Sequence, residues 1–213
     1  MTQVDRQELE QLTSLDRAAS IIETFLNDPT TYSDKDFRLR RGVCKVLEEE
    51  YKPLVLVANA VPGVESVRLF SLSNEGPDGE IQFNDKRIWN VQTTCSHEGH
   101  QRALMREQLQ HDGAAPGGKR HRDSSGRVVC EPSVFMVDDE VEVRVQRIRS
   151  AVQAKEQNFH QDTDTLIVYE EQAGARYLQE RNLHAQVVEA LREVPSSYER
   201  IYIVYGMDVH LAK

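Results

Sequence analysis

The side chains best suited to chemistry are an acid at the start of one predicted strand and polar groups on the next. Asp78 follows Pro77 in a turn and opens a strand, and Gln92 and Thr94 share one face of the following strand. Glu50 falls on the apolar side of a predicted helix, where a carboxylate needs a partner, a cation or a cavity. Oxygen ligands from neighbouring strands are what a Mg²⁺-dependent phosphodiesterase requires. The pattern indicates such a site, although Pro-Asp-Gly is also ordinary turn chemistry.

The order of elements over about residues 35–169, together with Pro77-Asp78, resembles the PD-(D/E)XK nucleases of the restriction-endonuclease-like superfamily. These proteins use a helix Glu, a strand-start Asp and an acid-x-Lys pair, which correspond by position to Glu50, Asp78 and Gln92-Thr93-Thr94. The resemblance implies Mg²⁺ held by Glu50, Asp78 and Gln92, with Thr94 positioning water. Glutamine stands where an acid is expected and threonine where lysine is expected. Lys86 or Lys45 could then supply the positive charge in space.

A second group of metal-ligand types follows the same strand. Cys95, His97, His100 and Cys130 are zinc-ligand types, and the first three are spaced closely enough for local chelation. The group lacks a Cys-x-x-Cys pair, and Cys130 is distant in sequence, so the sequence disfavours zinc and leaves the question open. Three cysteines are also too few for a disulfide framework.

Basic residues gather in a glycine-rich segment over residues 111–127, which is expected to be a flexible insertion. Lys119, Arg120 and Arg122 are its candidate contacts to a phosphate backbone. Its glycine and lysine spacing imitates a phosphate loop, but Arg120 stands where the magnesium-binding hydroxyl belongs. The net charge of −9 and pI near 5.3 exclude a surface that is basic throughout.

Hydrophobic periodicity and turn residues predict the elements that position these side chains. An amphipathic helix is expected over residues 5–27, with Leu12, Leu15, Ala19, Ile22 and Leu26 on its apolar side. The expected elements after it are a helix over 35–52 that Pro53 ends, strands over 54–61, 67–72, 80–83 and 87–94, and a polar helix over 97–110. On the second helix Glu49 is expected to point away from the apolar side and Glu48 to lie at its edge.

The last part of the chain predicts a crossover unit. A helix is expected over 137–160, with Arg144 and Arg147 opposite its apolar face, followed by a strand at 165–169, a helix at 175–194 and a strand at 201–205. The two strands are expected to pair in parallel through the helix between them. The fold class is therefore α/β tending to α+β, with a mixed sheet flanked by helices.

The chain is read as a single domain, residues 1–213. Its expected parts are an N-terminal helical extension at 1–30, a nuclease-like core at 35–110 and 128–213, and the insertion at 111–127. DNA or RNA is the expected partner. The alternative is a non-catalytic adaptor or regulatory protein that binds a protein partner or a second copy through the first helix. With no membrane span and no signal sequence in view, a cytoplasmic location is expected.

Overall fold

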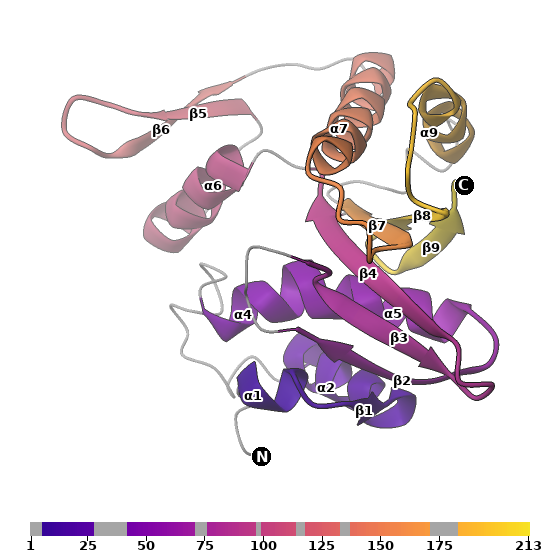
Figure 1. Ribbon diagram of the computed structural model, residues 1–213. Coiled ribbons are helices and arrows are strands. Elements are labelled where there is room, and N and C mark those ends of the chain that lie inside the picture. Colours follow the sequence, from indigo (N-terminus) through magenta and orange to yellow (C-terminus); the bar gives the residue numbers. More distant parts are fainter. Residues whose placement is uncertain are drawn as a thin grey trace.

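The computed structural model describes residues 6–27, 42–70, 76–96, 99–113, 118–132, 137–170 and 183–213. In these ranges the chain forms a seven-stranded mixed sheet with helices on both faces, and a separate two-stranded sheet (Figure 1). The predicted mixed α/β class is confirmed. Within the same ranges, no helix combines the length and the apolar character needed to cross a membrane.

The large sheet has the strand order β1-β2-β3-β4-β7-β8-β9. Its strands are β1 (Thr13–Ser14), β2 (Val64–Leu69), β3 (Gly79–Phe83), β4 (Ile88–Cys95), β7 (Thr165–Glu170), β8 (Arg200–Tyr205) and β9 (Asp208–Leu211). Strands β1 to β4 are successively antiparallel, which confirms the meander predicted for the strands over 67–72, 80–83 and 87–94. Strands β4, β7 and β8 are parallel, as the crossover pattern predicted for β7 and β8. The antiparallel edge strand β9 was not predicted.

Helices cover the two faces of this sheet with separate apolar cores. One face carries α2 (Leu15–Asn27) and the continuous run of α4 (Val43–Val46), the π-helical turn η2 (Leu47–Tyr51) and α5 (Lys52–Ala60). The other face carries α7 (Val137–Gln157) and α9 (Leu183–Arg192). Figure 1 shows the strands passing between these two layers. Of the helix predicted over 175–194, residues 171–182 lie outside the described ranges.

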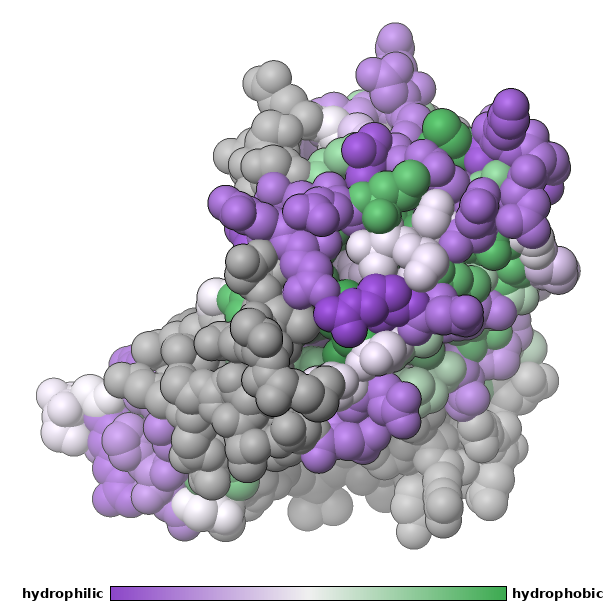
Figure 2. Space-filling view, turned by 90° about the horizontal axis from the view of Figure 1, so that it is seen from below, coloured by the Kyte–Doolittle hydropathy of each residue, from purple (hydrophilic) through white to green (hydrophobic). Residues whose placement is uncertain are grey.

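The N-terminal segment is part of the core rather than a helical extension. The predicted single helix over 5–27 is wrong, because α1 (Arg6–Leu9) ends before β1, which pairs with β2 at the sheet edge. The buried side chains of α2 are Ala18, Ile21, Ile22 and Phe25, whereas Leu12 and Leu26 are 48% and 39% exposed. The apolar face of this segment therefore packs largely on its own sheet. On the face seen in Figure 2, hydrophilic residues surround small, separate apolar areas.

The strand predicted over 54–61 is wrong, since this segment is helix α5. A continuous apolar run fits a buried helix as well as a buried strand, and Leu54, Val57 and Ala58 are fully enclosed between α2 and the sheet. Pro53 does not end the helix. The helix widens just before it, where the Lys52 N–H bonds to the carbonyl of Leu47, five residues back.

A separate arm projects beside the sheet (Figure 1). It consists of α6 (Gly99–Asp112) and the antiparallel pair β5 (Gly118–Arg122) and β6 (Val128–Pro132). The prediction of a flexible loop over 111–127 is therefore wrong for the five residues of β5. The basic sequence of β5 carries no apolar alternation, and the tight turn of the hairpin is closed by the Asp123 side chain and Gly126.

Candidate active site

Asp78 lies immediately before β3, where that strand stops pairing with β4. Its N–H donates to the carbonyl of Val91 at 2.8 Å. Its carboxylate accepts the backbone N–H of Thr93 at 2.7 Å and the Thr93 hydroxyl at 3.3 Å. The Asp78 carboxylate thus accepts the β4 N–H that a backbone carbonyl would accept if β3 continued. This role holds the carboxylate in one position at the sheet edge.

Lys155 of α7 reaches the same carboxylate. Its Nζ lies 3.5 Å from Asp78 Oδ2, and the two side chains are 26% and 31% exposed. Sequence reasoning missed this residue, although it continues the apolar row of Ile148 and Val152 on α7. A lysine on a buried helical face is the signal that could have indicated it.

Glu50 belongs to η2, which packs on the face of the sheet opposite α7. Burial raises the pKa of Glu50, the negative charge of Asp78 raises it further, and the charges of Arg6 and Lys45 oppose this rise. The predicted approach of Glu50 to Asp78 stays a prediction, which this electrostatic influence of Asp78 on Glu50 supports. Lys45 belongs to this side of the site through Glu49, whose Oε2 lies 3.8 Å from its Nζ.

The orientation predicted for the neighbouring glutamates is wrong. Glu48 is buried at 4% exposure rather than at the edge of the apolar side. Glu49, expected to point into solvent, has a side chain only 15% exposed and lies 3.6 Å from Arg106 of the arm. The α-helical projection failed because η2 is π-helical, so residues turn through a smaller angle than in an α-helix.

Gln92 is brought near Asp78 but points into the core. Its Oε1 accepts a short hydrogen bond from the Tyr198 hydroxyl, and its Nε2 donates to the Gly76 carbonyl at 3.4 Å. The residue is 3% exposed. Its carbonyl oxygen is therefore already engaged. Thr94 follows on the same strand and is partly exposed.

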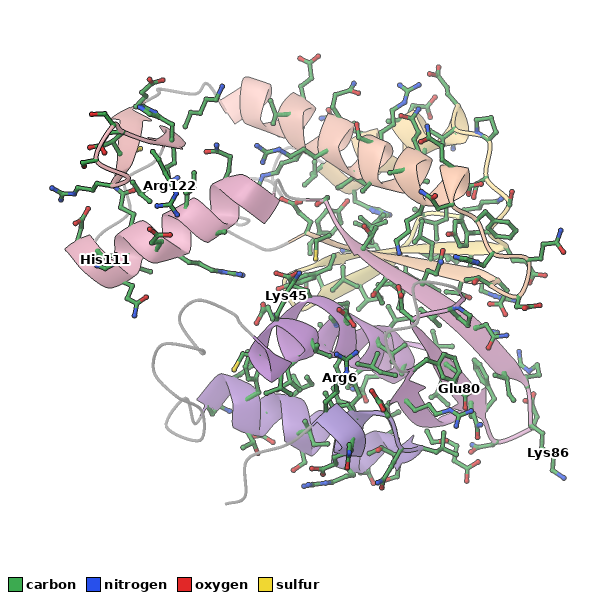
Figure 3. The ribbon with its side chains drawn as sticks, turned by 60° about the vertical axis from the view of Figure 1, so that its left-hand side comes forward. Arg6, Lys45, Glu80, Lys86, His111 and Arg122 are labelled. Atoms are coloured by element: carbon green, nitrogen blue, oxygen red, sulfur yellow. The ribbon has the colours of Figure 1, made fainter. Side chains whose placement is uncertain are left out.

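Lys86 cannot supply the missing charge. It lies in the turn between β3 and β4, at the opposite end of β3 from Asp78, as the register of the two strands requires. Five strand residues span roughly 17 Å, and Figure 3 shows Lys86 at the tip of the hairpin, far from Lys45. Lys155 is the described lysine that contacts Asp78.

Glu50 and Asp78 are the two carboxylates that could serve as ligands of Mg²⁺ here. Magnesium is commonly held by one or two carboxylates, with water and substrate phosphate completing its shell. Glu50 and Asp78 provide that minimum, and they come from elements on different sides of the strand end. Within the described ranges, no three His, Cys, Asp or Glu side chains gather as a metal-binding group.

The zinc candidates belong to different parts of the fold. Cys95 ends β4 and its Sγ lies 3.9 Å from the carbonyl of Glu49, whereas Cys130 lies on β6 of the arm opposite Arg120. His97 and the side chain of His100 lie outside the described residues.

The basic candidates on the arm differ in their surroundings. Arg120 is 7% exposed and its Nε donates to Gln108 at 3.0 Å, so it belongs to the packing of the arm. Arg122 forms two hydrogen bonds to Glu107, at 2.9 and 2.8 Å, and Figure 3 shows it at the junction of hairpin and helix. Lys119 is exposed. A residue that binds a phosphate backbone is expected to face solvent and to have no acidic partner. Among the described contacts of the three predicted residues, only those of Lys119 meet both conditions.

No protein-family model, curated protein or solved structure matches this chain. Inferences about its activity therefore depend on the residues themselves.

Proposed function

We propose that this protein is a metal-dependent phosphodiesterase of the nuclease type, in which Glu50 and Asp78 hold Mg²⁺ and Lys155 supplies the positive charge. The observation that carries the proposal is the meeting of these groups at one sheet edge. The Asp78 carboxylate contacts Lys155 from α7 and is electrostatically coupled to Glu50 from η2. Residues this far apart in sequence have no local reason to converge.

The arrangement of elements supports the same proposal. A helical run and the antiparallel strands β2, β3 and β4 are followed, after the arm of α6, β5 and β6, by α7 and the parallel strand β7. Without the arm, this is the order of the PD-(D/E)XK core. Asp78 lies at the strand start and Glu50 on the packed helix, as in that family's pattern. Lys155, which lies on α7, would supply the positive charge that the family's lysine provides and that Thr94 cannot.

Each residue has a separate task in the proposed reaction. A bound Mg²⁺ supplies Lewis acidity toward a phosphate oxygen. Asp78, held by the Thr93 N–H, keeps its carboxylate in a fixed position. The Lys155 ammonium is placed to stabilise negative charge that develops on the phosphate or to orient the attacking water. Glu50, partly desolvated, is suited to accept a proton from that water.

The test is cleavage of plasmid, single-stranded DNA and RNA with Mg²⁺ or Mn²⁺. We expect Asp78→Ala to abolish cleavage and Lys155→Met to lower it about 10²-fold or more, since one transition-state contact is commonly worth that much. Lys86→Met is the matched control because it removes an exposed lysine at the other end of β3. Cleavage that survives Asp78→Ala, or that responds equally to both lysine variants, would refute the assignment.

One observation favours the alternative, a non-catalytic adaptor with the same fold. Gln92 stands where the second acid is expected, and its oxygen is committed to Tyr198. If no substrate is cleaved with either metal, and duplex binding does not change across a salt series, the adaptor is the better interpretation.

A further inference from the structure

Three aromatic rings meet where helix α9 lies against the last two strands of the sheet (Figure 1). The imidazoles of His184, on α9, and His210, on β9, stack with their centres 4.4 Å apart and an angle of 30° between their planes. The ring of Tyr205, on β8, lies 5.4 Å from that of His210 and 6.3 Å from that of His184. This aromatic cluster therefore joins three elements, one of which is the edge strand β9.

Two polar atoms of the cluster are buried without a hydrogen bond to any described residue. They are Nδ1 of His184 and the hydroxyl oxygen of Tyr205. A neutral imidazole has an N–H at one ring nitrogen, whereas the imidazolium has an N–H at both. Protonated His184 would therefore bury an N–H that has no acceptor among the described residues, which is unfavourable. Burial and the charge of Glu170 raise the pKa of Tyr205, so its hydroxyl stays neutral.

The charges around the stack also oppose its protonation. Two imidazolium ions at this separation would repel each other. Burial lowers the pKa of His184, and the charge of His210 lowers it further. Charged groups on the surrounding elements are Asp208, exposed on the same face of β9 as His210, and Glu170 of β7, which pairs with Arg144 of α7. Neither carboxylate provides His184 Nδ1 with a hydrogen bond.

We propose that the stacked His184 and His210 form a pH-sensitive latch, which holds α9 on the edge strand β9 while both rings are neutral and releases the strand on acidification. Above the ordinary histidine pKa of about 6.5, both rings are neutral and the stack is intact. Below it the opened form takes up a proton more readily than the stacked form, so the equilibrium shifts toward opening as the pH falls. The latch does not depend on the function proposed above, because neither histidine belongs to the candidate site.

Amide hydrogen exchange measures the opening strand by strand. We expect the protection of the amides that bond between β8 and β9 to fall about five- to tenfold from about pH 7.5 to about pH 5.5, after correction for intrinsic exchange. A free imidazole one pH unit below its pKa favours the opened form by about that factor. Amides between β2 and β3, in the other half of the sheet, should keep their protection. An equal fall there would mean general unfolding and would overturn the inference.

The variant His184→Phe keeps a ring against His210 and removes one of the two proton sites. We expect β9 to be as protected as in the native protein at neutral pH and to remain so on acidification, because His210 can then be protonated beside an uncharged ring. His111→Phe is the matched control, since His111 is exposed near the end of α6 and its loss should leave the response of β9 intact. A native protein without the pH response, or a His184→Phe protein that retains it, would contradict the latch.

Proton NMR of the native protein decides if His184→Phe does not fold. The imidazole C–H signals follow each histidine through a pH titration. We expect His184 to titrate with a pKa below the ordinary histidine range. Titration of His184 within the ordinary range would overturn the inference, because the stack would then not oppose its protonation.

Discussion

Two ion pairs made by α7 differ in how completely their charges are enclosed. Arg144 lies 3.4 Å from Glu170, the side chains are 7% and 6% exposed, and Ser96 also donates to Glu170. Lys155 lies 3.5 Å from Asp78, but these side chains are 26% and 31% exposed and Glu50 adds a second negative charge nearby. The first pair is closed and joins helix to strand. The second retains solvent access.

The comparison also corrects the predicted solvent face of α7. Arg144 was expected opposite the apolar side, yet it is buried. It sits one residue before Val145 and faces the carboxyl end of β7, where Glu170 compensates it. Buried arginine is rare unless paired, and its partner lies too far along the chain to be recognised from periodicity.

The largest effect should come from opening the closed pair with Arg144→Met. Removing one partner leaves the Glu170 charge buried without its guanidinium, which typically costs about 3–5 kcal/mol. Urea unfolding measures the change. Arg149→Met on the same helix is the control, because its side chain is 30% exposed and pairs with Glu193 at 3.8 Å. Surface pairs contribute about 0–1 kcal/mol, so similar losses in the two variants would contradict the distinction.

A smaller effect is expected from Tyr198→Phe, which tests the engagement of Gln92. The buried amide oxygen loses its donor, at a cost of about 1–3 kcal/mol in the free energy of unfolding. Tyr205→Phe is the matched comparison, since the Tyr205 hydroxyl is buried without a hydrogen-bond partner among the described residues. Chemical unfolding of Tyr205→Phe should show no loss of stability. Equal losses would mean that the bond to Gln92 contributes nothing specific.

The smallest effect, and one of opposite sign, should come from Glu50→Gln. A carboxyl whose pKa is raised by folding binds its proton more tightly in the folded state, so its ionisation lowers stability as pH rises through the folded pKa. We expect the variant to be more stable than the native protein at pH 7, by about 1 kcal/mol or roughly 2–4 °C. The gain should shrink on acidification below the ordinary glutamate range. Thermal unfolding at several pH values measures it, and a loss of stability at pH 7 would argue against the coupling to Asp78.

The sequence predicted well where short-range patterns suffice. Strands β3 and β4 alternate polar and apolar residues between tight turns, and the apolar runs of β7 and β8 flank a helix. It failed at α5, because an apolar run that is buried on every side carries no periodicity to distinguish helix from strand. It failed at the first strand of the arm for the opposite reason, since Gly118–Arg122 contains no apolar residue that would indicate a strand.

The candidate site divides in the same way. Glu50 and Asp78 were proposed from their residue types and positions, and Gln92 from its place on the strand predicted over 87–94. The engagement of Gln92 by Tyr198 joins residues 106 positions apart, and the contact of Lys155 with Asp78 joins residues 77 apart. Neither contact can be predicted from the residues that surround each partner in the sequence.

Local propensity and the burial of apolar area act over a few residues, so the chain alone determined its mixed α/β class, its meander and the polar side chains available at the strand ends. Which charges are sealed together and which remain accessible depends on distances between elements that only packing sets. The buried Glu48 is the clearest case: its carboxylate accepts a hydrogen bond from the Tyr169 hydroxyl of β7, 121 positions away, and only the folded chain brings them together.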